Sequence, residues 1–142
     1  MFSGIIEQVG EVINIEDHGD RRLAIKTKFA KKDIKIGSSV CCNGVCLTVH
    51  TIKKNNANLV LSFDVSKETL KCTNFNNLYS GSLINLEKSL KVGDEISGHF
   101  VFGHVDTVSK LKSIKKSGKS YILEFTLPKN IRKLATNLEV YD

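Results

Sequence analysis

The sequence is poor in proline and in aromatic residues. Its 142 residues include one Pro, one Met and no Trp, and aromatic residues make up 7%. Hydrophobic residues make up 41%, which argues against a disordered chain and for a packed core. The length suits one ordinary domain, which buries roughly 68% of the surface of its unfolded chain.

Arginine is scarce, and this bears on the meaning of the net charge of +6. Arg21, Arg22 and Arg132 are the three arginines, and lysine supplies the other basic residues. Bidentate contacts to bases and phosphates favour Arg, so the charge fits a solvated surface better than a nucleic-acid interface. A small basic barrel that binds nucleic acid also needs a platform of stacking aromatics, and it ranks last among our hypotheses.

Long apolar segments are absent as well. The longest uncharged stretch, residues 36–52, carries Ser, Asn, Thr, His and three Cys. It is too polar, and slightly too short, for a membrane span. Glu7 comes too early for the apolar region of a secretory signal. We therefore expect a cytoplasmic protein with no membrane partner.

The four cysteines have no C-x-x-C spacing, which argues against a zinc site. In a cytoplasmic protein they should be reduced thiols. Cys41, Cys42 and Cys72 are expected to be small, buried side chains in strands. We therefore expect no metal.

Short β-rich segments alternate with turn residues, as in a sandwich or barrel. We expect six strands, at residues 4–15, 22–29, 38–42, 45–52, 58–65 and 82–86. Gly10 is a candidate bulge, Asn43-Gly44 predicts a type I′ hairpin turn, and Ser66 can cap a short helical turn. One face of the second strand would carry Leu23, Ile25, Thr27 and Phe29. Six strands in this length favour a closed barrel, because closure removes free sheet edges.

The chain also resembles itself at an offset of 99 positions. The matches are Gly4 with Gly103, Val9 with Val108, Val12 with Leu111, Ile15 with Ile114, Gly19 with Gly118, and Leu23 with Ile122. This predicts a first barrel over residues 1–97 and the start of a second, incomplete barrel over 98–142. The hairpin region 37–49 would map to 136–148, so the second copy holds about two strands, which are marginal alone.

Four segments, in order along the chain, resemble motifs of the riboflavin synthase family. They are residues 1–7 (MFSGIIE), 43–49 (NGVCLTV, similar to NGxCLTV), 63–70 (FDVSKETL, similar to FDxxxETL and followed by Thr73-Asn74) and 98–106 (GHFVFGHVD, similar to GGHxxxGHVD). Together they extend over most of the chain.

The resemblance implies an all-β fold: a six-stranded Greek-key closed barrel followed by an incomplete repeat of it. The family has two such barrels and a C-terminal helix that holds a trimer. It dismutates two molecules of 6,7-dimethyl-8-ribityllumazine, and transfer of a four-carbon unit gives riboflavin and a pyrimidinedione without cofactor or metal. The family's active site lies between the N-barrel of one subunit and the C-barrel of the next. Association with lumazine synthase is a further expectation.

Two functions remain open beside the nucleic-acid hypothesis. The first is riboflavin synthase, with this chain a truncated form whose 142 residues alone can be inactive. The second is a non-catalytic protein that binds lumazine or riboflavin, as a monomer or as a homodimer in which each barrel replaces the missing partner.

The candidate site begins with the alternation of side chains along one strand. Cys46 and Thr48 share one face, and Leu47 and Val49 share the other. From the residues alone, Cys46 can also face the core and Thr48 can pair across the sheet, but the resemblance favours ligand contact. Asp64 is either a carboxylate at a strand end or an acceptor for ribityl hydroxyls.

The resemblance supplies the remaining candidates. The substrate-binding set is Gly4, Ile5, Ile6, Cys46, Leu47, Thr48, Asp64, Val65, Ser66, Lys67, Glu68, Thr69, Gly103, His104 and Val105, and the catalytic set is Cys46, His104, Phe2 and Ser39. Phe2 is either an aromatic lid or part of the N-terminal packing. His104 is either an acid/base group or a contact between barrels. Thr69 is either a ligand contact or a helix-surface residue.

Overall fold

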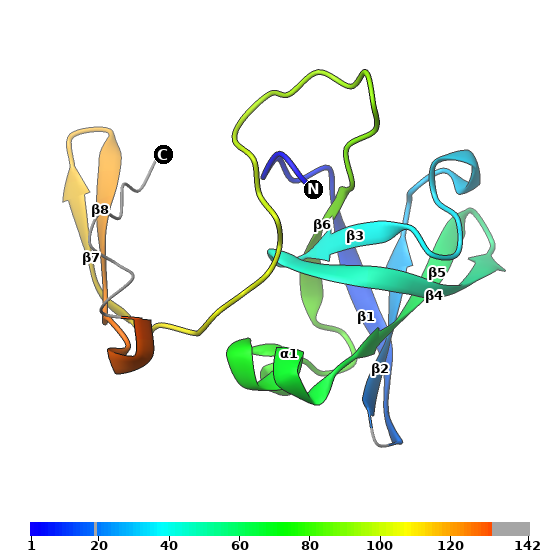
Figure 1. Ribbon diagram of the computed structural model, residues 1–142, viewed down its shortest axis with the longest axis horizontal. Coiled ribbons are helices and arrows are strands. Elements are labelled where there is room, and N and C mark those ends of the chain that lie inside the picture. Colours follow the sequence, from blue (N-terminus) through cyan, green and yellow to red (C-terminus); the bar gives the residue numbers. More distant parts are fainter. Residues whose placement is uncertain (19, 132–142) are drawn as a thin grey trace. The chain divides into compact units, whose positions relative to one another are not determined.

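Six antiparallel strands close into a barrel in the first part of the chain (Figure 1). The computed structural model describes residues 1–18 and 20–131. The barrel strands are β1 (Gln8–His18), β2 (Asp20–Thr27), β3 (Ser39–Cys42), β4 (Val45–Asn55), β5 (Asn58–Val65) and β6 (Leu83–Lys88). Their order around the barrel is β1-β2-β5-β4-β3-β6. Strands β3, β4 and β5 are neighbours in chain order, and β5 then lies beside the earlier strand β2. This is the Greek-key connection, and it confirms the expected fold.

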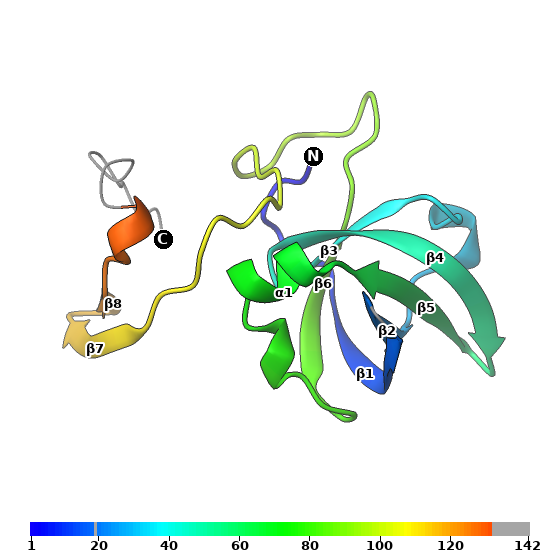
Figure 2. The same cartoon turned by 60° about the horizontal axis from the view of Figure 1, so that its bottom comes forward.

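The barrel closes where its first and last strands meet. In that ladder Gln8 pairs with Leu86 and Glu11 pairs with Leu83, and Figure 2 shows the strands curving around the interior. Closure leaves no strand of this sheet with an unpaired edge, which is how small barrels avoid edge-to-edge association.

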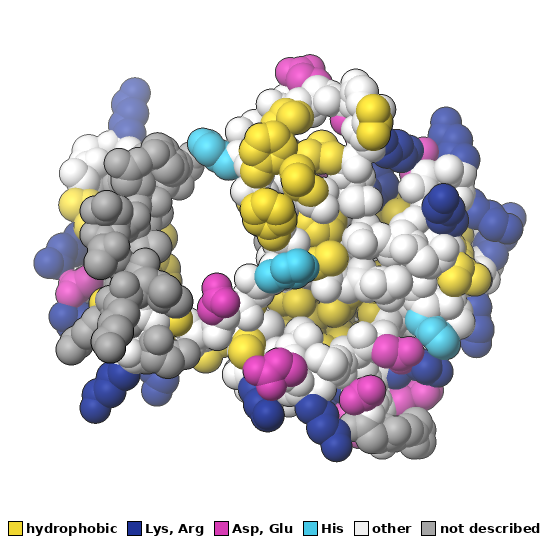
Figure 3. All heavy atoms as spheres, viewed as in Figure 1, with side chains coloured by type: hydrophobic (Ala, Val, Ile, Leu, Met, Phe, Trp, Pro, Cys, Tyr) yellow, Lys and Arg dark blue, Asp and Glu magenta, His cyan; other side chains and the backbone are white. Residues whose placement is uncertain are grey.

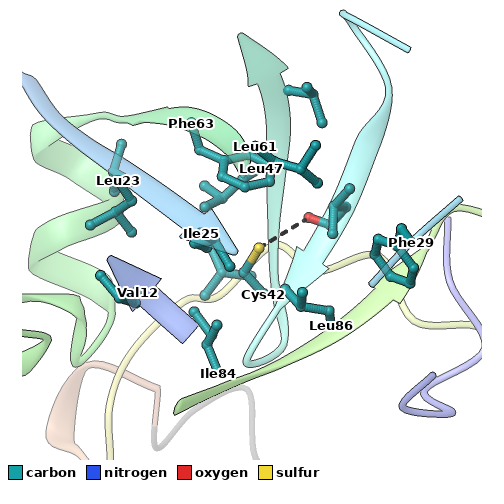
Figure 4. Packing of buried hydrophobic residues seen from close by; sticks show 14 of the residues in the cluster. Val12, Leu23, Ile25, Phe29, Cys42, Leu47, Leu61, Phe63, Ile84 and Leu86 are labelled. Atoms are coloured by element: carbon teal, nitrogen blue, oxygen red, sulfur yellow. Dashed lines mark hydrogen bonds between the residues drawn. The ribbon is translucent and has the colours of Figure 1, made fainter. Parts of the chain in front are cut away.

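The interior is filled by alternate side chains from all six strands (Figure 4). Leu23, Ile25, Leu61 and Phe63 are fully buried, as the alternation in β2 predicts. Cys42 also points inward, and its Sγ lies 3.9 Å from the carbonyl oxygen of Val40. At about 25 cal/mol for each Å² of apolar surface removed from water, this core is the main stabilising contribution.

The bulge in β1 lies further along the strand than the sequence predicts. The register with β2 shifts between Val12 and Asn14, whereas Gly10 pairs regularly with Ile84. Gly10 is needed for close packing instead: a Cβ there would lie 2.6 Å from Leu86 Cδ1. The strand also begins at Gln8 rather than at residue 4.

Local turn chemistry follows the sequence. Asn43 and Gly44 have φ values of 47° and 84°, as a type I′ turn requires. Ser66 caps helix α1 (Lys67–Cys72), because its Oγ accepts a hydrogen bond from the backbone N–H of Thr69 at 3.1 Å. Cys72 was expected in a buried strand, but it is the last residue of this helix, is half-buried, and its Sγ donates to Glu68 at 3.6 Å.

Residues 98–105, which we call the crossing segment, run antiparallel to the N-terminus. Phe2 donates its N–H to the carbonyl oxygen of Val101 at 2.8 Å, and Val101 donates back to Phe2 at 3.0 Å. Phe2 and Val101 are themselves separated by the repeat offset of 99 positions. The contact therefore pairs two positions that the sequence offset relates to each other.

The chain after Val105 contains a second hairpin of the same design. The contacts divide the molecule into Met1–Val105 and a second unit that starts at Asp106. In the second unit, β7 (Leu111–Ser117) pairs with β8 (Ser120–Phe125), and the register shifts between Leu111 and Ser113. That shift lies 99 positions after the one in β1, the same offset as that found in the sequence.

The offset changes by one residue after the second hairpin's turn. Leu23 pairs with Ile15 in the barrel, and Ile114 pairs with Leu123 in the second hairpin. Leu23 therefore corresponds to Leu123 rather than to Ile122, because the second turn is longer by one residue. Gly19, used in the sequence comparison, lies outside the described residues. Among those described, no helix has the length and apolar character needed to cross a membrane.

Candidate functional site

The side chains predicted to bind a ligand lie mainly on the outer face of the barrel. Along β4, Leu47 and Val49 are buried in the core, Thr48 is exposed and Cys46 is half-buried. The alternation of the strand therefore turns Cys46 and Thr48 outward, so Cys46 does not face the core, and the outer face carries the polar groups.

A polar row crosses four neighbouring strands on this outer face. Ser39 of β3 lies opposite Thr48 of β4, and Asp64 of β5 lies opposite Arg22 of β2. Val49 and Phe63 are the last pair of the β4–β5 ladder, and continuing this antiparallel register by one step would put Thr48 beside Asp64. The outer polar row thus consists of Ser39, Thr48, Asp64 and Arg22, and it brings together three predicted residues from three strands.

Arg22 holds Asp64 with two parallel hydrogen bonds. Nε donates to Oδ1 at 2.6 Å and Nη2 donates to Oδ2 at 3.1 Å, and His50 Nδ1 lies 3.4 Å from Oδ2. The Arg22 hydrogen bond is the main reason that the pKa of Asp64 lies below its usual range. A carboxylate has about four acceptor positions, so Asp64 stays ionised and retains capacity for hydroxyl donors.

The helix cap lies next along the chain from this carboxylate. Ser66 Oγ and Thr69 Oγ1 are 3.0 Å apart, and both belong to the segment that resembles the family's FDxxxETL motif. Ser66, Lys67 and Glu68 are exposed, and Thr69 is half-buried. Val65 is fully buried, so it can offer a ligand its backbone but not its side chain, and the same holds for Leu47.

The crossing segment rests on Cys46 through Gly103. The N–H of Cys46 donates to the carbonyl oxygen of Gly103 at 2.9 Å. A Cβ on Gly103 would lie 2.8 Å from that nitrogen and 2.9 Å from Cys46 Cβ, and Gly103 has a φ of +76°. Both the approach and the conformation therefore require glycine. They bring Gly103 to Cys46 and leave its neighbours His104 and Val105 exposed.

The N-terminal segment is attached to the same face by a buried carboxylate. Glu87 of β6 is 3% exposed. Its Oε1 accepts hydrogen bonds from the N–H of Ser3 at 2.6 Å and of Gly4 at 3.1 Å. Gly4 lies beside Val101, with 3.3 Å between an added Cβ and Val101 Cγ2. Gly4 is thus held on the β6 side of the barrel, whereas Asp64 and Arg22 pair at the β5–β2 junction.

The remaining N-terminal candidates differ in exposure. Phe2 is fully buried, so it occupies the packed position rather than that of an open lid, whereas Ile5 and Ile6 are about half exposed. Apolar side chains gather over the N-terminus and the crossing segment in Figure 3. Phe100 and Phe102, each 60% exposed, contribute to the exposed apolar residues here.

Sequence reasoning did not identify three charged or titratable residues of this face. Arg22 and His50 contact Asp64, and Glu87 holds the N-terminus. Alternation turns Arg22 outward, but its pairing with a residue 42 positions away depends on the strand order. Glu87 directly follows the apolar residues of β6, and this charged position at the end of an apolar strand is the sequence feature that could have identified it.

Two larger hollows each include one of the predicted site residues. One of 530 Å³ includes Lys35 and Ser39, and one of 420 Å³ includes Ile5 and Glu87. Neither is lined by Thr48 or Asp64, but Asp64 and Arg22 line a smaller hollow of 260 Å³ together with Glu16 and Asp20. Within the described residues, no three His, Cys, Asp or Glu side chains are grouped as a metal site.

Comparison with known proteins decides the family. Residues 3–89 match the family described as Lumazine binding domain. The chain belongs to this family. The match covers β1 to β6, and so includes the outer polar row and the helix cap.

Relatives and solved structures of lumazine-binding proteins extend the likeness beyond the first barrel. The chain is 39% identical to riboflavin synthase of Brucella abortus over 130 residues and 43% identical to that of Chlamydia muridarum over 120 residues. These matches cover 89% and 82% of this chain but 63% and 57% of the relatives, so the chain spans about three-fifths of their length. The structure of LumP complexed with 6,7-dimethyl-8-(1'-D-ribityl) lumazine matches with a TM-score of 0.74 at 25% identity, over 92% of this chain and 71% of that one.

Proposed function

We propose that the outer face of the first barrel binds 6,7-dimethyl-8-ribityllumazine and riboflavin. The observation that carries this proposal is the alignment of Ser39, Thr48 and Asp64 across three strands, on a barrel of the Lumazine binding domain family. LumP, whose fold matches this chain, has been solved with the ribityllumazine and with flavin mononucleotide.

The chemistry of the ligand suits these groups. A ribityl chain carries several hydroxyls, and Asp64, kept ionised by Arg22, accepts hydrogen bonds from them. Thr48, Ser66 and Thr69 add hydroxyls that can both donate and accept. The heterocycle would lie against Cys46 and the backbone of the crossing segment, where glycine permits close approach.

We further propose that this chain belongs to a riboflavin synthase, which dismutates two molecules of 6,7-dimethyl-8-ribityllumazine to riboflavin and a pyrimidinedione. The relatives of that name span more residues than this chain, and the dismutation needs two lumazines held against each other. Orientation of two bound reactants can supply about 7–11 kcal/mol of the barrier. His104, exposed beside Gly103, is the candidate acid/base group for the methyl proton, and Cys46, Ser39 and Phe2 remain in the proposed catalytic set.

Titration of the protein's ligand tests the binding proposal. Asp64→Ala and Thr48→Ala should each weaken riboflavin binding about tenfold, equivalent to about 1.4 kcal/mol, with an unchanged circular dichroism spectrum. Glu11→Ala, which removes an exposed carboxylate paired with Lys26, is the control and should bind normally. Unchanged affinity in both site variants would remove the outer polar row from the site.

Turnover separates the enzyme from the alternative, a non-catalytic binding protein. We expect the 142-residue polypeptide to bind riboflavin and to form it from ribityllumazine very weakly or not at all, because the part of the chain that the structure describes holds a single polar row of this kind. Riboflavin absorbance after mixing with ribityllumazine measures this. Turnover at an ordinary enzymatic rate without an added partner would contradict the expectation.

The partners follow from the same proposal. The exposed apolar side chains Ile5, Phe100 and Phe102 suit contact with a second lumazine-binding barrel, from a homo-oligomer with the trimer, dimer or monomer left open. Association with lumazine synthase, a cytoplasmic location, and the absence of nucleic-acid or membrane partners are parts of the proposal that need their own measurements. Sedimentation with and without riboflavin tests the oligomer.

A further inference from the structure

Two thiols face each other across the hairpin that carries the candidate site. Cys41 of β3 and Cys46 of β4 are directly paired in the register, next to the pair Cys42 and Val45 that flanks the turn. Partners in register point to the same side of a sheet. Cys41 and Cys46 therefore lie side by side on the outer face.

The position of this pair in the ladder brings the two side chains close. In a two-residue hairpin the pair flanking the turn exchanges hydrogen bonds, so the next pair does not. The N–H of Cys46 indeed points away from β3, since it donates to Gly103 at 2.9 Å. Such pairs have Cα atoms about 4.5 Å apart, which lies inside the range of about 4.4–6.8 Å found for disulfides.

The other two cysteines lie in different surroundings. Cys42 is fully buried and faces the core, on the opposite side of the sheet from Cys46. Cys72 lies on α1, where its Sγ donates to Glu68. All four are thiols in the structure, so the Cys41–Cys46 pair is present in its reduced state.

The two thiols differ in their surroundings, and this difference decides which of them reacts first with an oxidant. Cys41 is 4% exposed, and burial, followed by the charge of Glu87, raises its pKa to about 11. Cys46 is half-buried and reachable from outside. An oxidant must therefore react first at Cys46, and Cys41 resolves the product from within, because thiolates rather than thiols attack disulfides.

We propose that Cys41 and Cys46 are a modification site that forms a reversible disulfide across the β3–β4 hairpin. The co-reactant is a small-molecule disulfide, RSSR. Cys46 thiolate attacks one sulfur, which forms the Cys46–SR bond and releases RS⁻. The sulfur of Cys41, having lost its proton, then attacks Cys46 Sγ and releases the second RS⁻. The net change is two protein thiols and RSSR to one protein disulfide and two RSH.

The disulfide would also act on ligand binding, and this part rests on the proposed function. Gly103 sits directly on Cys46, where an added Cβ would lie 2.9 Å from Cys46 Cβ. Bonding Cys46 Sγ to Cys41 draws that side chain toward β3 and fixes the surface beneath the crossing segment. Riboflavin binding should then weaken about tenfold, which is about 1.4 kcal/mol.

The first measurement is chemical and needs no ligand. The full chain is equilibrated with oxidised glutathione, alkylated and digested with trypsin, and the peptide of residues 36–53 is weighed. We expect the loss of two hydrogens, with one alkylated cysteine at Cys42, reversed by dithiothreitol. Cys41→Ser and Cys46→Ser should abolish the loss, whereas Cys42→Ser and Cys72→Ser should retain it.

A second measurement separates the two proposals. Riboflavin is titrated into reduced and oxidised protein, with Cys41→Ser as a variant that cannot close the disulfide. No mass loss under any glutathione ratio, or its persistence in Cys41→Ser, overturns the disulfide whatever the titration shows. A disulfide that forms in a protein that binds no riboflavin in either state leaves this site standing and refutes the proposed function. Equal affinity of reduced and oxidised protein refutes the coupling between them.

Discussion

The hairpins β1–β2 and β7–β8 have the same backbone design and very different surroundings. Both are antiparallel, and both shift register at equivalent positions, between Val12 and Asn14 and between Leu111 and Ser113. Leu23 is fully buried, yet its equivalent Leu123 is 49% exposed. Pairing and bulge are therefore set within about twenty residues, whereas burial depends on strands supplied from elsewhere in the fold.

Matched leucines give the largest expected contrast. Leu23→Ala should lower the free energy of unfolding by about 2–5 kcal/mol, because it leaves a cavity in the barrel core. Leu123→Ala removes the same atoms from an exposed strand and should change it by less than about 0.5 kcal/mol. Urea denaturation followed by circular dichroism measures both. Similar losses in the two variants would mean that the second hairpin is as buried as the first.

The buried carboxylate of the barrel should come next in magnitude. Glu87→Ala removes the acceptor of the Ser3 and Gly4 N–H groups, and an unsatisfied buried group costs about 1–3 kcal/mol. We expect faster amide exchange at Ser3 and Gly4 by NMR. Glu124→Ala, in β8, is the exposed control and should leave amide exchange at Ser3 and Gly4 unchanged; protected amides in Glu87→Ala would contradict this account of the N-terminus.

Substitutions at two glycines with positive φ distinguish the effect of backbone strain from the effect of a steric contact. Gly103→Ala forces a Cβ against Cys46, whereas Gly118, with a φ of 61°, has open space around it. Gly103→Ala should weaken riboflavin binding about tenfold, and Gly118→Ala should leave it unchanged although both carry backbone strain. Fluorescence titration distinguishes them, and equal affinities would show that the crossing segment does not cover the ligand.

The smallest expected effect concerns two exposed carboxylates. A hydrogen bond from Arg22 lowers the pKa of Asp64, and one from Lys112 lowers the pKa of Glu124. A lowered pKa stabilises the fold above the unfolded-state value of about 4, and this contribution is lost as the pH falls through the folded value. NMR titration should show that the pKa of Asp64 rises in Arg22→Gln and that the pKa of Glu124 rises in Lys112→Gln.

Ligand binding extends the same comparison. As the pH is lowered, riboflavin affinity should be lost at a higher pH in Arg22→Gln than in the unsubstituted protein, because Asp64 is then protonated at a higher pH. In Lys112→Gln the pH of this loss should not change. An unchanged pH of loss in Arg22→Gln would mean that the ligand does not need ionised Asp64.

The features predictable from the sequence are those with a local cause. The Asn43-Gly44 turn and the Ser66 cap depend on residues within a few positions of each other, and both are present. The bulge was assigned to Gly10 because glycine often marks one, but the real reason for that glycine is its approach to Leu86. Leu86 belongs to β6, which lies beside β1 in the barrel but far from it along the sequence.

The site shows the same division. Alternation put Cys46 and Thr48 on one face without saying which, the resemblance favoured the ligand face, and the family motifs supplied Asp64 and Thr69. The partner of Asp64, Arg22, and the contact of Gly103 with Cys46 were missed, because each joins segments that only the closed barrel brings together.

The closing ladder between β1 and β6 has a kinetic consequence. The β3–β4 hairpin can form within about 1–10 μs, since its turn joins neighbouring residues. The pairing of Gln8 with Leu86 must first bring distant parts of the chain together, and such non-local contacts slow folding. We therefore expect the hairpin that carries Cys46 and Thr48 to form before the β1–β6 ladder closes the barrel.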